Sequence, residues 1–419
     1  MHTFTLIFLT FLAALMAMRL WLAARHIAHI ARCRDAVPPE FAEHIALDAH
    51  QKAADYSIEK TRLGMKETIA DGLFLLLITL GGGILWVDSL SAQWLGNGYA
   101  RGIATVFGVM LLSGILFLPF ELIRTFDIEA RYGFNKMTIG LYIVDAVKGI
   151  ALALLVGVPL LLVTFSLIET MGTYWWFYVW LVWLGFSVLM IAVYPAFIAP
   201  LFNKFSPLDN DSLKKRIENL LARCGFRAQG LYVVDGSKRS SHGNAYFTGF
   251  GKTKRIVFFD TLIERLSAEE IEAVLAHELG HFKRRHILKL LVARFAIALI
   301  ILAAMGWVID KPWFYEGVGM GSAIPHLGVA VIAFFLLLPV FIFPLTPLGS
   351  YVSRKHEFEA DAYAAEQTRA GDLVSALVKL YRDNASTLTP DALHSMIYDS
   401  HPPAAIRIAH LKALAATHY

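Results

Sequence analysis

The chain has 419 residues, a net charge of +4 and a mean hydropathy of +0.54, with 57% hydrophobic and 17% charged residues. A soluble domain carries about 25% charged residues, so this composition excludes an ordinary soluble protein and places the chain in a lipid bilayer. The small net charge comes without a long basic tract, so nucleic acid is not an expected partner. Two cysteines, Cys33 and Cys224, are too few for a disulfide framework.

Seven segments stay apolar over about 20 residues, the length that crosses a bilayer as a helix. They are residues 3–23, 71–89, 103–123, 147–168, 175–199, 287–308 and 326–348. No basic residue precedes the first segment, whereas several follow it, which is the reverse of the order in a cleaved signal peptide. We therefore expect the first span to be retained.

Basic residues predict the orientation of these spans, because cytoplasmic loops carry an excess of Lys and Arg. Residues 24–70 and 124–146 are rich in both, whereas the other short loops hold only Arg101 and Lys311. These loops with few basic residues are 90–102, 169–174 and 309–325. The pattern predicts an N-terminus outside, a C-terminus in the cytoplasm, and both large polar segments on the cytoplasmic side.

The last two spans divide the polar sequence into two parts. The chain is organised as 1–199 with five spans and their loops, 200–286 as a first cytoplasmic part, 287–348 as two further spans, and 349–419 as a second cytoplasmic part. We expect a mainly helical fold, in which seven transmembrane helices carry one small cytoplasmic α+β unit made from both polar parts.

The first polar part contains helix and strand signals. Residues 211–225 have helical periodicity and end in glycine. Three short segments have strand character: 230–236, 244–250 and 254–260. Residues 251–254, between the last two, have the composition of a turn. A helix then begins at Ser267, which forms a capping-box pair with Glu270.

That helix carries the motif H-E-x-x-H, with His277 and His281 four residues apart and Glu278 between them. Residues at this spacing project from one face of a helix, and two imidazoles with a carboxylate are natural ligands for zinc. Glu278 is placed to take a proton from a water at the open position and to pass it to a leaving amine. Two idle surface histidines are the alternative, but the helix is largely apolar. The sequence predicts a hydrolytic metal site.

A third ligand is expected from a second helix, because no later histidine completes the longer H-E-x-x-H-x-x-G-x-x-H pattern. Residues 353–366 offer Glu357 and Asp361, which are four apart and share a face. We expect Glu357 to bind the metal and Asp361 to accept the outer N–H of a ligating histidine. Glu359 points elsewhere. Ordinary surface charge on a helix is the alternative reading of this segment.

Several motifs in order resemble those of the type I CAAX prenyl proteases, membrane zinc endopeptidases with seven spans that process prenylated proteins. They are IEARYGFNKMT (128–138), IAPLFNKFSPL (198–208), SHGNAYFTGFGKTKRIVFFDTL (241–262), HELGHFK (277–283), SRKHEFEADAYA (353–364) and SHPPAAIRI (400–408). The likeness covers nearly the whole chain. It implies spans that enclose a large water-filled chamber, with one Zn²⁺ per chain at its cytoplasmic end.

The resemblance assigns zinc ligation to His277, His281 and Glu357, the base role to Glu278, and support of the metal site to Asp361. It also implies that substrate adds as an extra strand to an edge strand at residues 244–246. The residues of that strand are Asn244, Ala245 and Tyr246. An exposed edge has free backbone groups for an extended peptide.

The resemblance further places His401 and Arg407 beside the cleft, where His401 could stabilise an oxyanion and Arg407 could hold a substrate carbonyl or carboxylate. A helix cap with a salt bridge is the structural alternative for both. The family commonly has an acidic residue directly before this arginine, and the chain has Ile406 there.

The compact, alanine-rich chain fits a bacterial member of the family. We therefore expect the protein in the bacterial inner membrane, and the endoplasmic reticulum membrane is the alternative location. The expected substrates are peptides or proteins, including prenylated ones. The alternative function is quality control of misfolded or misinserted membrane proteins without a prenyl requirement.

Three other classes fit less well. A transporter or channel would not need the metal motif, and a scaffold without activity would be expected to lack a ligand or Glu278. The shorter membrane metalloproteases of heat-shock quality control share both acidic motifs but have fewer spans.

Overall fold

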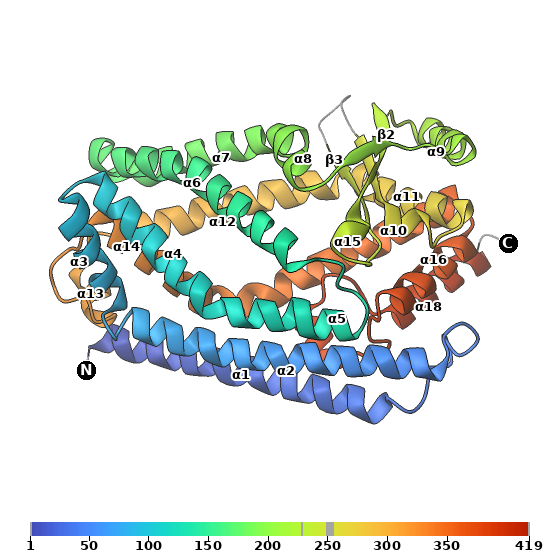
Figure 1. Cartoon of the computed structure of the whole chain (residues 1–419), viewed down its shortest axis with the longest axis horizontal. Helices are drawn as coiled ribbons and strands as arrows, with labels where there is room; N and C mark the ends of the chain where they lie inside the picture. Colours follow the sequence, from blue (N-terminus) through green and yellow to red (C-terminus); the bar gives the residue numbers. More distant parts are fainter. Residues whose placement is uncertain (1, 228, 249–254, 418–419) are drawn as a thin grey trace.

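The computed structural model describes residues 2–227, 229–248 and 255–417. The molecule is elongated and mainly helical, and its membrane helices run along the long axis towards a small sheet near one end (Figure 1). The membrane part contains α1 (Thr3–Cys33), α2 (Leu47–Ile78), α3 (Gly83–Leu95), α4 (Tyr99–Leu122), α5 (Glu129–Arg131), α6 (Ile139–Thr170), α7 (Trp175–Val193), α8 (Ala199–Phe202), α12 (His286–Val308), α13 (Pro312–Gly317) and α14 (Leu327–Ile342). Short π-helices continue α4 and α7 at Ile123–Ile128 and Tyr194–Ile198.

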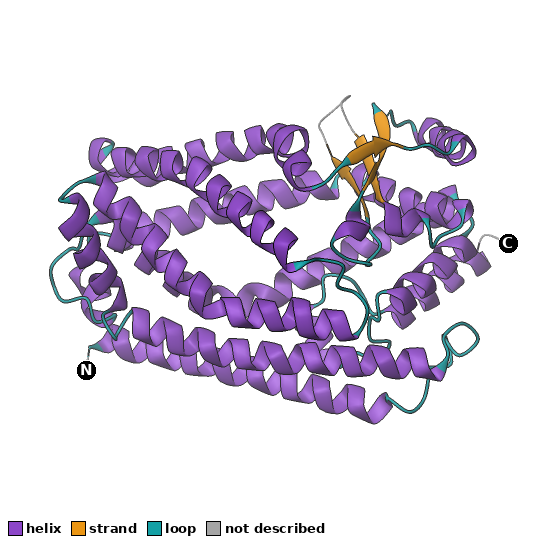
Figure 2. Ribbon diagram, in the orientation of Figure 1, coloured by secondary structure: helices purple, strands orange, loops and turns teal. Residues whose placement is uncertain are grey.

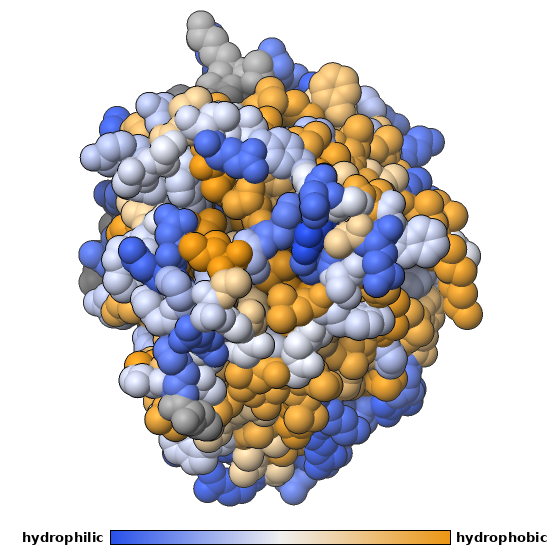
Figure 3. Space-filling model, turned by 90° about the vertical axis from the view of Figure 1, so that its left-hand side faces the viewer, coloured by the Kyte–Doolittle hydropathy of each residue, from blue (hydrophilic) through white to orange (hydrophobic). Residues whose placement is uncertain are grey.

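Among the described residues, six helices are long and apolar enough to span a membrane, and the bent pair α2–α3 would make a seventh. The predicted span at 71–89 covers the end of α2 and the start of α3, and the chain turns by 57° between the two helices. Gly82 allows the turn, since its φ of 77° lies in the left-handed region that favours glycine. Many large apolar side chains on these helices stay exposed, as Figure 3 shows in orange, and they are suited to face lipid.

Two membrane helices continue directly into the polar unit. α12 begins at His286, three residues after α11 (Ala268–Lys283) ends. The apolar helix α14 leads through a single turn at Phe343–Leu345 into α15 (Thr346–Gln367), so the predicted span 326–348 includes the start of a helix that reaches far beyond it. The two helices that carry the predicted ligands therefore extend membrane spans.

The polar unit combines both polar segments of the sequence (Figure 2). Its other helices are α9 (Asp211–Cys224), α10 (Asp260–Ile263), α16 (Ala370–Asp383), α17 (Ala392–Tyr398) and α18 (Ala404–Thr417). One hydrophobic core joins α9, α11, α15 and α16 to the sheet, with Ile217, Leu220, Phe258 and Leu279 buried in it.

The sheet has the strand order β1-β2-β4-β3, with β2 and β4 parallel and the outer pairs antiparallel. Its strands are β1 (Phe205–Pro207), β2 (Gly230–Val234), β3 (Ala245–Thr248) and β4 (Arg255–Phe259). Three of the four were expected. β1 was not, since three residues that end in proline carry little strand signal. Of the predicted strand at 244–250, residues 249 and 250 lie outside the described residues, as does the predicted turn at 251–254.

Candidate metal centre

The first ligand helix, α11, begins where the sequence predicts. The Ser267 hydroxyl accepts a hydrogen bond from Glu270 N–H, and the Glu270 carboxylate accepts one from Ser267 N–H, which completes the capping box. Ser375 and Lys379 on α16 also bind Glu270, so the start of α11 is held from two sides. Within its last two turns, α11 presents His277 and His281 towards α15.

Close contact between α11 and α15 depends on Gly280. A Cβ at this position would lie 2.9 Å from Ala360 Cα and 3.0 Å from Ala360 O. Only a residue without a side chain allows the two helix backbones to approach this closely. The approach brings Glu357 of α15 opposite the two histidines.

Three side-chain atoms converge between the helices. His277 Nε2 and His281 Nε2 are 3.2 Å apart, and the Glu357 carboxylate lies 3.5 Å from the first and 3.3 Å from the second. Ligands held about 2.0–2.1 Å from a tetrahedral zinc ion are about 3.3 Å from one another. Glu357 Oε2 is buried and has no hydrogen-bond donor in the described structure. The residues therefore fit a metal ion bound by two imidazoles and one carboxylate.

A second layer of charge surrounds this group. Asp361, which is fully buried, lies 2.8 Å from His277 Nδ1 on the side away from Glu357. Arg407 donates two hydrogen bonds to the same carboxylate, at 2.9 and 2.5 Å. The Arg407 side chain is buried as well, so its charge is compensated inside the protein.

The ionisation of these groups follows from their contacts. Burial alone would raise the pKa of Glu357, but contacts with His277, His281 and His401 hold the pKa well below its usual range. Burial likewise opposes ionisation of Asp361, and His277 and Arg407 lower its pKa. For His277, burial disfavours the charged ring, yet Asp361 and Glu357 raise the pKa to about 9. Both carboxylates are thus charged at neutral pH, and a metal ion would displace the proton from His277.

Glu278 and His401 are less buried than Asp361 and Arg407. The Glu278 side chain is half-buried and makes no hydrogen bond or ion pair with the residues that the structure describes. His401, whose side chain is 61% exposed, has its Nδ1 2.7 Å from Glu357 Oε2, but not in hydrogen-bond geometry.

The predicted edge strand, β3, lies at the outer side of the sheet, and its register decides which backbone groups are free. Phe259 N–H donates to Asn244 O, so Asn244 and Phe259 form a hydrogen-bonded pair of the ladder. Hydrogen-bonded pairs alternate along an antiparallel strand, so the next such pair on β3 is Tyr246 with Val257. The backbone groups of Ala245 and Phe247 point to the open edge. Asn244 precedes the strand, and its side-chain oxygen accepts from Ala245 N–H.

This register changes the predicted set of residues 244–246. The Tyr246 backbone is occupied by β4, because hydrogen-bonded positions alternate along an antiparallel strand. Phe247, which the sequence analysis did not select, takes its place at the free edge. A strand of unknown register could not reveal which of its residues point outward.

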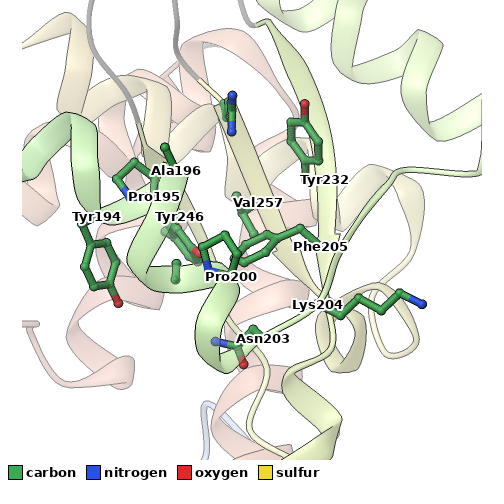
Figure 4. Close-up of a pocket in the computed structure, with 12 residues that line it drawn as sticks. Tyr194, Pro195, Ala196, Pro200, Asn203, Lys204, Phe205, Tyr232, Tyr246 and Val257 are labelled. Carbon is green, nitrogen blue, oxygen red and sulfur yellow. The ribbon is translucent and has the colours of Figure 1, made fainter. Parts of the chain in front are cut away.

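The side chains of β3 separate in the same alternating way. Ala245 and Phe247 face α11, and the Phe247 ring lies 4.9 Å from that of Phe282. Tyr246 faces the other side, where it lines a cavity of about 330 Å³ with Tyr194, Phe205 and Tyr232 (Figure 4). This cavity lies between the sheet and the end of the α7 segment, on the sheet face opposite to the metal ligands.

The motif at 128–138, which the sequence alone could not explain, connects the membrane part to the segment before β3. Glu129 accepts a hydrogen bond from Tyr56 and lies 3.5 Å from His242 Nε2. The ring of Phe134 stacks on that of His242 at 4.5 Å, and Asn135 forms a β-bridge with Ser240. These contacts hold the chain that leads into the edge strand.

Known proteins share this arrangement over the whole chain. A family model for the CAAX prenyl protease N-terminal region, with five membrane helices, matches residues 26–204, and the model of peptidase family M48 matches residues 207–415. The CAAX prenyl protease 1 homolog of Oryza sativa subsp. japonica is 40% identical over 321 residues, which are 75% of this chain and 74% of the relative. The chain belongs to the M48 family of CAAX prenyl proteases.

Other relatives give the same result at longer coverage. The Homo sapiens CAAX prenyl protease 1 homolog is 33% identical over 426 residues, 90% of this chain and 89% of that protein. The crystal structure of S. mikatae Ste24p superposes with a TM-score of 0.91 at 30% identity and covers 98% of this chain and 99% of that one. The predicted fold class is confirmed: a helical membrane protein of the type whose spans enclose a chamber, with a small catalytic unit.

Membership also establishes the class of activity. The protein is a multi-pass membrane metalloprotease, an enzyme that hydrolyses peptide bonds of peptide or protein substrates. A metal cofactor follows from the family, and His277, His281 and Glu357 form a possible site for it. The expected bacterial origin stays a prediction.

Proposed function

We propose that this chain is a zinc endopeptidase whose active site faces the cytoplasm and whose substrates are membrane-associated polypeptides with a prenylated C-terminal CAAX sequence. The observation that carries the proposal is the group His277, His281 and Glu357, with ligand atoms 3.2–3.5 Å apart as tetrahedral zinc requires. The printed names of the relatives support the substrate class, since they are CAAX prenyl proteases.

Zinc, when bound, would supply a Lewis acid that lowers the pKa of a coordinated water to about 7 and polarises the scissile carbonyl. Glu278 follows His277 directly on α11 and has a free carboxylate, so we assign it as the base that takes the proton of the attacking water. The same carboxylate then gives a proton to the leaving amine.

The remaining predicted residues divide into two roles. His401 is exposed next to Glu357, where its imidazole can donate to the oxyanion of a substrate. Arg407 is buried and bound to Asp361, so we propose that it holds Asp361 against His277 and does not itself bind substrate. Ala245 and Phe247 would pair with an extended substrate at the open edge of β3.

The base role of Glu278 is tested with Glu278→Gln in the full-length protein, purified in detergent. This variant should keep one zinc per chain while its cleavage rate falls about 10²–10⁴-fold, because only the proton acceptor is lost. Metal analysis and a peptide-cleavage assay measure the two quantities. An unchanged rate would remove Glu278 from the mechanism, and loss of zinc would mean that the carboxylate is needed for metal binding.

The substrate class is tested with one peptide sequence made in two forms, with and without an isoprenyl group on its cysteine. Cleavage of the prenylated form at a much higher kcat/KM supports the CAAX assignment. Equal cleavage of both forms contradicts it and supports the quality-control function.

A further inference from the structure

The two histidine ligands differ in what supports them from behind. His277 Nδ1 meets Asp361 directly, at 2.8 Å. His281 Nδ1 instead lies 3.0 Å from Nδ1 of a third histidine, His286. The other ring nitrogen of His286, Nε2, lies 2.9 Å from Glu359. A chain of two contacts therefore leads from the metal site through His286 to a carboxylate.

The protons of this chain can be assigned from the metal outward. A metal on His281 Nε2 leaves the proton of that ring on Nδ1. Nδ1 of His286 must then accept this N–H, which leaves the proton of the His286 ring on Nε2, where Glu359 accepts it. Glu359 thus selects the one neutral tautomer of His286 that can orient His281. Both ring nitrogens of His286 are engaged, so this residue is not a fourth ligand.

The local backbone and packing hold His286 in place. Arg285, between α11 and α12, has a φ of 56°, which residues with a Cβ rarely adopt. This sharp turn returns the first residue of α12 to the metal site. The His286 side chain is 1% exposed, and the His356 ring stacks on it at 3.9 Å with an angle of 11° between the planes.

We propose that His286 is a positioning residue for His281, and that Glu359 acts through it. α15 would then contribute three carboxylates in three different ways: Glu357 to the metal, Asp361 behind His277, and Glu359 behind His281 by way of His286. Ligating histidines commonly donate their second N–H to such an outer partner. The inference rests on the proposed zinc site and adds the outer partner of its second ligand.

The test measures the zinc dissociation constant of the full-length protein by competition with a chelator. His286→Leu removes the acceptor, so we expect zinc to bind about 10–100-fold more weakly. His286→Asn can keep an acceptor close to the position of Nδ1 and should recover most of the affinity. His44→Leu, which makes the same change at an exposed histidine between α1 and α2, is the matched control and should bind zinc as the unaltered protein does.

The result that overturns the proposal is equal zinc affinity of His286→Leu and the unaltered protein, or equal loss in His286→Leu and His286→Asn, which would indicate packing alone. The melting temperature of the metal-free variants is measured in parallel. A general loss of stability is recognised by a similar fall in the melting temperatures of His286→Leu and His286→Asn.

Glu359 is tested with Glu359→Ala, alone and combined with His286→Leu. The double variant should bind zinc no more weakly than His286→Leu, because Glu359 has no other route to the metal. Additive losses would contradict a shared route. Failure of the unaltered protein to bind zinc would instead refute the proposed function, so the two failures are distinct.

Discussion

At the scale of single residues, Gly280 decides whether the metal site can assemble. Its absent side chain leaves space for the backbone of Ala360, and Glu357 stands one turn before that alanine on α15. The three ligand atoms lie within 4.8 Å of one another only because the two helices approach closely here. A glycine inside a helix is otherwise unfavourable by about 1 kcal/mol relative to alanine.

Gly280→Ala should separate α11 from α15 by a few tenths of an ångström and lower stability by about 1–3 kcal/mol, as overpacking does in dense cores. We also expect weaker zinc binding, since Glu357 moves with α15. Gly349→Ala on α15 is the control, because a Cβ there meets no atom within 4 Å. Thermal unfolding and zinc titration check both variants, and an unaffected Gly280→Ala protein would contradict the role given to this contact.

Glu357 and Asp361 share one face of α15 but have different predicted roles. Glu357→Gln should abolish stoichiometric zinc, because a ligand is lost, whereas Asp361→Asn should weaken zinc binding by about 10–100-fold. Metal analysis after dialysis separates the outcomes. If Asp361→Asn loses zinc as completely as Glu357→Gln, the two residues do not differ as ligand and supporting residue, and this assignment is wrong.

At the scale of elements, β3 is an edge strand with a defined open side. The ladder to β4 uses the backbone of Asn244 and Tyr246, so the backbone groups of Ala245 and Phe247 point to the open edge. An incoming chain that pairs with Ala245 N–H would replace its present acceptor, the Asn244 side chain. Recognition through the backbone tolerates many side chains. Selectivity must then come from how a substrate reaches this strand from the membrane.

Ala245→Pro tests the strand directly. Proline lacks the N–H that points to the open edge. That N–H donates to the Asn244 side chain and takes no part in the ladder, so β3 can remain paired with β4. We expect a lower kcat/KM than for Ala245→Ser, which retains the N–H, with zinc content equal in the two variants. If both variants cleave one peptide equally fast, substrate does not pair at Ala245.

At the scale of the whole molecule, segments far apart in the chain build one catalytic unit. α11 and α15 are separated by two membrane helices in the sequence and pack side by side in space. α1 also joins this end, since Arg25 forms two hydrogen bonds, of 3.0 and 2.9 Å, with the buried Asp391 before α17. The catalytic unit lies at one end of the long axis, and α3 and α13 lie at the other (Figure 1).

The proposed orientation predicts that these two ends lie on opposite sides of the membrane. In a background without Cys33 and Cys224, an impermeant thiol reagent added to intact cells should label Ser322→Cys and leave Ser206→Cys unlabelled. Both serines are exposed. Permeabilised cells should label both variants equally. Labelling of Ser206→Cys from outside would reverse the topology that the basic residues predict.

The sequence by itself determined the features that depend on local spacing and composition. Apolar length predicts membrane helices, and the spacing of four residues places His277 with His281 and Glu357 with Asp361 on common faces. The capping box at Ser267 and Glu270 is local too, and the structure contains it. Membership of the family followed from motifs that can be read in order along the chain.

Only the tertiary structure decided which of these faces meet. The contacts of Arg407 with Asp361, and of His286 with Glu359, join residues 46 and 73 positions apart, and no periodicity encodes such pairs. The bend between α2 and α3 and the register of β3 likewise depend on packing against neighbours. Local spacing places a side chain on a face, but the backbone approach at Gly280 determines which face lies opposite.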